Sequence, residues 1–241
     1  ELAMANEDEQ INSSEDVARQ AIAQRIDRYI ADYSEDMPFV SLAKRIKLGI
    51  LSGGDVYQLA QEAQKIYEEN TTENGHYGAL AASILLRLPN ISTVKNDEAA
   101  AESILTKAEE ILGEMRDELK DVIEKKLENL PKNSGGVEKL LNKIFEVLNS
   151  DVIRSDFLQP MLNSLNNFLN DYQSIVTEHS AEAKELEQRN IWSRWNTRKK
   201  KEDHSAIAEV YSQRIKFLEP LKEPLEELIK EAKHVELLRK D

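Results

Sequence analysis

The sequence predicts an all-α protein: a bundle of about seven to nine helices with a long coiled-coil-like α-hairpin in its C-terminal third. The 241 residues include only eight glycines and six prolines. Leu, Ala, Glu and Lys, which lose little side-chain freedom in a helix, are abundant. Apolar residues recur every three or four positions along nearly the whole chain, and the alternating β-branched runs that indicate strands are nearly absent.

The first part of the chain is expected to form an N-terminal helical subdomain over residues 14–95, preceded by a disordered acidic segment over residues 1–13. Ser13 or Ser14 caps a first helix that ends near residue 33. Its expected core-facing residues are Val17, Ile22, Ile26 and Ile30. This spacing predicts that one face of the helix is buried.

Three shorter helices are expected in the rest of this subdomain. Pro38 opens the second helix, and the pair Gly53-Gly54 ends it, since glycine readily adopts the conformations that terminate helices. Asp55 is a plausible N-cap for the third helix. A polar turn over residues 71–78 then leads to a helix over 79–88. This last helix is apolar on every side, which places it at the centre of the subdomain.

Residues 96–150 are expected to form a long connecting helix followed by an amphipathic one. The long helix ends before Pro131, and the amphipathic helix covers residues 137–149. The apolar stripe of the long helix is predicted to consist of Ile104, Ala108, Ile111, Met115, Leu119 and Val122.

Residues 151–241 contain two apolar seams with alternating steps of four and three residues, the pattern of coiled coils. One seam begins at Leu158, and the other begins at Ile207 and is interrupted near Glu219 by two prolines. The two starting points are 49 residues apart, a whole number of heptads, so one continuous helix remains an alternative. We expect an antiparallel hairpin, because the polar segment between the seams tolerates a turn and each seam can bury its stripe against the other.

The most unusual segment is the predicted hairpin tip, residues 189–201, which has six positive charges and no negative one. The complete chain has a formal charge of −13, and both of its tryptophans lie in this segment. Trp and Arg are enriched among the energetic anchors of protein interfaces. The expected binding residues are Trp192, Arg194, Trp195, Arg198, Lys199, Lys200 and Lys201.

This composition predicts a non-enzymatic helical interaction or adaptor protein that contacts an acidic or helical protein partner. One alternative is peripheral binding to an anionic membrane, because tryptophan and lysine favour such surfaces. A second alternative is an enzyme whose active site contains no recognisable linear motif. Nucleic-acid binding is not expected, since binding to polyphosphate depends on a basic face and this chain is acidic. The sequence does not indicate an oligomeric state.

No catalytic residue, metal site or cofactor is predicted. The chain has no cysteine, which excludes thiolate metal sites and disulfides. Its four histidines, His76, His179, His204 and His234, are not spaced three or four residues from one another. His179 falls on the first seam and is expected to be half-buried, whereas His76 is expected to be exposed in a polar turn.

The predicted location is the cytoplasm, because no apolar run reaches the ~18 residues of a membrane span and the acidic N-terminal region has no signal-peptide core. The glutamate-rich stretch over residues 219–236 is similar to the C-terminal export signals of bacterial effectors secreted by type IV systems. That resemblance implies a secreted effector delivered to the cytosol of a host cell as an alternative.

Overall fold

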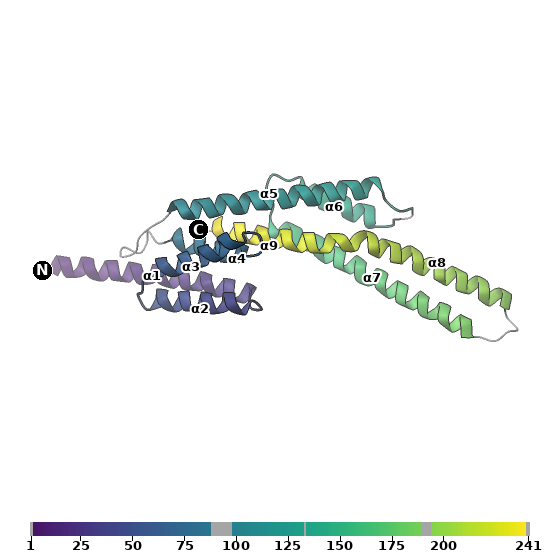
Figure 1. The fold of residues 1–241 in the computed structure, drawn as a ribbon, viewed down its shortest axis with the longest axis horizontal. Coiled ribbons are helices and arrows are strands. Elements are labelled where there is room, and N and C mark those ends of the chain that lie inside the picture. Colours follow the sequence, from purple (N-terminus) through teal and green to yellow (C-terminus); the bar gives the residue numbers. More distant parts are fainter. Residues whose placement is uncertain (1, 88–97, 133, 189–193, 240–241) are drawn as a thin grey trace. The chain divides into compact units, whose positions relative to one another are not determined.

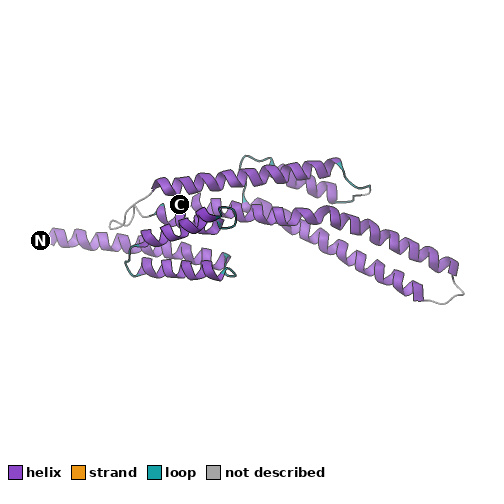
Figure 2. Cartoon of the chain, in the orientation of Figure 1, coloured by secondary structure: helices purple, strands orange, loops and turns teal. Residues whose placement is uncertain are grey.

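The computed structural model describes residues 2–87, 98–132, 134–188 and 194–239, and every regular element in these ranges is helical (Figures 1 and 2). The predicted all-α class is therefore confirmed. In chain order the elements are α1 (Leu2–Asp32), α2 (Met37–Leu51), α3 (Val56–Glu69), α4 (Gly75–Leu85), α5 (Glu98–Glu128), α6 (Val137–Leu148), α7 (Ser155–Gln188), α8 (Arg194–Leu218), the 3₁₀ turn η3 (Glu219–Leu221) and α9 (Lys222–Arg239). Among the described helices, none is both long and apolar enough to cross a membrane.

The chain divides into two compact units. Unit 1 contains Glu1–Leu112 and Lys233–Asp241, and unit 2 contains Gly113–Ala232. The boundaries between these units lie inside α5 and α9, whereas the sequence suggested subdomain boundaries near residues 95 and 150. Periodicity locates an apolar stripe, but it does not indicate which other helix that stripe packs against.

The core of unit 1 is built around α4. All residues from Tyr77 to Leu85 are buried, as expected for a helix that is apolar on every side. Helices α1, α2 and α3 pack with it in one hydrophobic cluster, which includes the fully buried Phe39 and Ile46. Leu238 from the end of α9 belongs to the same cluster. The predicted central position of this helix is thus confirmed, although it begins at Gly75, inside the expected polar turn.

His76 lies in an aromatic cluster and not in an exposed turn, which corrects the expectation from the sequence. Its ring stacks on Tyr33, with 4.6 Å between ring centroids, and packs edge-on against Phe39. Its Nε2 is 2.7 Å from Oδ2 of Asp36. The Tyr33 hydroxyl also hydrogen-bonds His234 of α9. His76 lies in the first turn of α4, which begins at Gly75.

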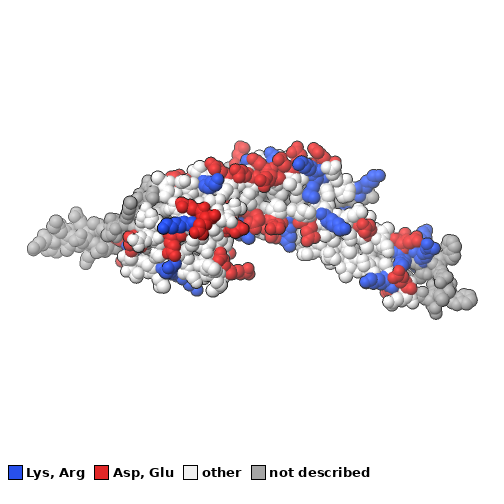
Figure 3. Space-filling view, viewed as in Figure 1, with Lys and Arg blue, Asp and Glu red and all other residues white. Residues whose placement is uncertain are grey.

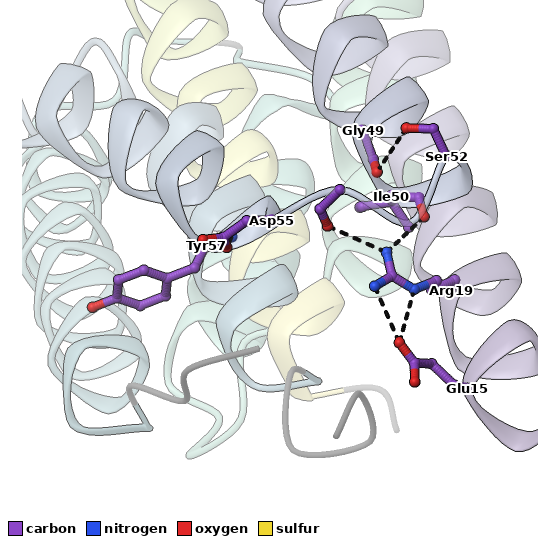
Figure 4. A network of polar contacts seen from close by, with 8 residues as sticks. Glu15, Arg19, Gly49, Ile50, Ser52, Asp55 and Tyr57 are labelled. Atoms are coloured by element: carbon purple, nitrogen blue, oxygen red, sulfur yellow. Dashed lines mark hydrogen bonds and ion pairs between the residues drawn. The ribbon is translucent and has the colours of Figure 1, made fainter. Parts of the chain in front are cut away.

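Arg19 connects α1 to the end of α2 (Figure 4). Its Nη1 donates to the carbonyl oxygen of Ile50 at 2.8 Å, and its Nη2 is 3.1 Å from Oε1 of Glu15. The last carbonyls of a helix have no partner inside it; that of Ile50 accepts from the backbone N–H of Gly53 and from Arg19 of the neighbouring helix. Gly53 follows with φ +77, a left-handed conformation that glycine adopts without steric cost.

Some sequence expectations about individual faces are wrong. The helix α1 begins at Leu2, whereas the sequence suggested a disordered segment over residues 1–13. Val17 is 67% exposed. In α5, Val122 is exposed and Ile123 is buried. Adjacent side chains on a helix point about 100° apart. If the buried face is predicted one residue too early, the residue named as buried therefore faces the solvent.

Unit 2 contains α6 and the two arms of the predicted hairpin. The amphipathic helix α6 buries Leu141 and Ile144, and it packs against α7. At the other end of the second arm, η3 separates α8 from α9. The predicted interruption near Glu219 is therefore confirmed, and Pro220 within η3 supplies the reason, because proline cannot continue the hydrogen-bonding pattern of an α-helix.

Candidate functional site at the end of the hairpin

Helices α7 and α8 pack against each other as an antiparallel pair, which confirms the hairpin over the continuous helix. Two aromatic contacts fix their register. Tyr172 faces Tyr211 at 5.2 Å between ring centroids, and His179 faces His204 at 5.0 Å. From the first contact to the second, the chain advances seven residues along α7 and goes back seven residues along α8. One heptad register therefore extends from the middle of the hairpin toward its end.

The middle of the hairpin is a packed seam. Leu158, Leu165 and Tyr172 of α7 are buried, and Arg214 of α8 lies over the ring of Tyr172, 5.5 Å from its centroid. Burial raises the pKa of Tyr172, and the Arg214 charge opposes this shift. The apolar seam thins toward the end of the hairpin. Among the described side chains, Ala183 is the last buried residue of α7 and Ala208 is the first of α8.

The structure describes only part of the predicted binding segment. Trp192 lies outside the described residues, and Arg194 and Trp195 are placed in the first turn of α8 by their backbone alone. The side chains of Arg198, Lys199 and Lys200 are exposed, and that of Lys201 is partly buried. Figure 3 shows Lys and Arg side chains together with acidic ones at the end of the hairpin.

Two of these four cations are paired with acids of the same protein. Nε of Arg198 lies 3.3 Å from Glu202 one turn further along α8, and Lys201 contacts Glu187 of α7. The hydrogen bond from Lys201, together with its charge, lowers the pKa of Glu187. Lys199 and Lys200 form no ion pair with any residue in the described part of the chain. Of the four described cations in the predicted binding segment, these two are therefore the ones not occupied by an acid of the same protein.

A second feature of the hairpin end is a three-residue cluster that the sequence did not predict. Nδ1 of His179 lies 2.7 Å from Nδ1 of His204. Oε2 of Glu182, one turn after His179, lies 3.0 Å from Nδ1 of His204 and 3.9 Å from Nδ1 of His179. These three ligand atoms could hold a metal ion. The cluster was missed because the two histidines come from different helices, 25 residues apart, so no short motif contains both.

Comparison with protein-family models, with curated proteins and with solved structures finds no significant match to this chain.

Proposed function

We propose that this protein is a non-enzymatic interaction module whose hairpin end binds an acidic surface of a partner protein. The observation that carries the proposal is the exposure of Lys199 and Lys200 without internal ion pairs, in a chain of net charge −13. Residues 189–201 carry six positive charges and no negative one, so the hairpin end is the part of this acidic chain that attracts an acidic partner most strongly. Attraction confined to one end orients the approach of the partner, and such complementarity affects mainly the association rate.

The position on a hairpin also supports this proposal. The exposed lysines lie on the first turns of α8, whose far end is anchored by the buried Leu218 and by Leu221 of the following turn η3. The segment before them includes both tryptophans, which provide large apolar contact area at low entropic cost. A small group of positive charges next to aromatic side chains is typical of a protein–protein interface. A face that is basic throughout is more typical of nucleic-acid binding.

The test is charge reversal with a matched control. Lys199→Glu combined with Lys200→Glu is expected to slow association with the partner about tenfold at low salt, with a smaller effect at high salt. The control is Lys44→Glu with Lys65→Glu, which makes the same charge change at exposed positions of α2 and α3. Proteins captured by the wild type and the control, but not by the tip variant, would be purified and their binding kinetics measured.

Two results would contradict the proposal. A partner that associates equally fast with the tip variant does not use these lysines. The second result is that no protein partner is captured and the wild type binds vesicles of phosphatidylcholine with phosphatidylserine, but not vesicles of phosphatidylcholine alone. The acidic surface would then be a membrane.

A further inference from the structure

We infer that His179, Glu182 and His204 form a binding site for one divalent transition-metal ion of the zinc class, which joins the two arms of the hairpin near its end. This inference goes beyond the proposed interaction function. It uses different side chains and a different kind of ligand.

The geometry of the helices brings the three groups together. Residues three apart on a helix share a face, so His179 and Glu182 both point from α7 toward α8. His204 lies opposite His179 in the register that also pairs Tyr172 with Tyr211. The possible ligand atoms of the three residues all lie within 4.8 Å of one another. The backbone register therefore places the two histidines opposite each other, and the Glu182 side chain reaches from α7 to His204 of α8.

The donor set matches zinc chemistry. Zinc binds imidazole nitrogen and carboxylate oxygen at about 2.0–2.2 Å in tetrahedral sites, which places neighbouring donor atoms about 3.3 Å apart. The three donor separations here are 2.7, 3.0 and 3.9 Å, so they bracket that value. The side chains of His179, Glu182 and His204 are 23%, 43% and 27% exposed, respectively. This exposure leaves room for the donor atoms to move by about half an ångström.

The contact between the two Nδ1 atoms is itself informative. Without a cation, one imidazole must donate its proton to the lone pair of the other, since two lone pairs at 2.7 Å repel. A metal ion uses both lone pairs at once, and the Glu182 carboxylate supplies negative charge beside it. A bound proton could also be shared at this position, so the experiment must separate the metal from the proton.

The position of the cluster gives the metal a structural consequence. Beyond His179 the hairpin buries only Ala183 among its described α7 side chains, so little apolar packing holds the two arms together there. A metal bound to both helices would cross-link them where that packing is weakest. Three protein ligands leave a fourth position for water or for a donor from outside the chain.

The test is titration of the full chain with zinc chloride after treatment with a chelator, followed by calorimetry. We expect one zinc ion per chain, and a rise in the unfolding temperature of the hairpin with zinc concentration, because a ligand that binds the folded state stabilises it. Cobalt chloride should give the intense visible absorption of a tetrahedral site. The absorption and the stoichiometry report coordination directly, and a shared proton would produce neither.

Substitutions locate the site. His204→Gln and Glu182→Gln should each weaken zinc binding about tenfold or more, since even supporting residues of metal sites contribute that much. Glu185→Gln, an exposed acid on the same helix, should bind zinc like the wild type. Circular dichroism checks that each variant retains its helices. The variant Lys199→Glu with Lys200→Glu should still bind zinc, so this test is independent of the proposed interaction.

The inference would be overturned if zinc bound the His204→Gln variant as tightly as the wild type, or if the wild type bound no zinc at neutral pH. Equal loss of binding in Glu185→Gln and Glu182→Gln would also overturn it. That result would indicate diffuse attraction to the acidic chain and no defined site.

Discussion

Replacing Arg19 with methionine is expected to destabilise unit 1 by about 3 kcal/mol, because removing one partner of a buried ion pair leaves the other charge uncompensated. Arg19 is only 6% exposed. Its guanidinium serves two purposes at once. It neutralises Glu15, and it supplies a donor to the last turn of α2 through the carbonyl of Ile50. Methionine preserves most of the apolar stem of the side chain, so the loss reports chiefly on the charged group.

Hydrogen exchange of peptides from α2 is the appropriate measurement, because a chain with two compact units need not unfold in a single transition. A loss of 3 kcal/mol corresponds to exchange that is faster by about a hundredfold, at 1.4 kcal/mol for each factor of ten. Peptides from α7 should exchange at an unchanged rate, since that helix belongs to unit 2.

Two further variants separate the causes. Arg28→Met removes an exposed arginine from the same helix and should change exchange very little. Adding Glu15→Gln to Arg19→Met should recover about 1 kcal/mol, because it removes the charge that the first substitution left unpaired. If Arg19→Met behaves like Arg28→Met, the buried network of Figure 4 does not stabilise the unit.

The parts of the fold that follow from local sequence were predictable. Gly53-Gly54 ends α2, and Asp55 caps α3 by accepting a hydrogen bond from the backbone N–H of Tyr57. The burial of α4 follows equally from its composition. Each of these features depends on a few neighbouring residues, so the sequence contains all the information needed to predict it.

Features that depend on the pairing of distant helices were not predictable in the same way. The sequence shows that Glu15 and Arg19 are one turn apart, a spacing that usually indicates a solvent-exposed pair. Only the packing of α1 against α2 shows that Arg19 is buried. The cluster of His179 and His204 is an intermediate case. Once the hairpin and its heptad register are known, the two positions fall opposite each other, and the pair could have been found by reading the two seams in antiparallel order.

Replacing Gly78 with alanine is expected to destabilise unit 1 by about 2 kcal/mol, because added volume in a packed core forces neighbours out of their preferred conformations. A Cβ atom at this position would lie 2.5 Å from Cδ2 and 2.7 Å from Cγ of Tyr67. Those distances are far inside van der Waals contact. Tyr67 is buried on α3 and Gly78 is buried within α4, so the ring has little room to move and the two helices must separate. Alanine has a higher helix propensity than glycine, so any loss of stability is attributable to packing.

Gly113→Ala provides the matched control, since it makes the same substitution inside α5, where a Cβ atom would meet nothing within 4 Å. There the helix propensity of alanine should dominate and stabilise the protein by about 0.5–1 kcal/mol. Hydrogen exchange of peptides from α4 and from α5 measures both effects. Tyr67→Leu in the Gly78→Ala background should cost less than the sum of the two single changes, because leucine has no ring to meet the new methyl group. If the effects are simply additive, the contact between α3 and α4 is not the reason that glycine stands at position 78.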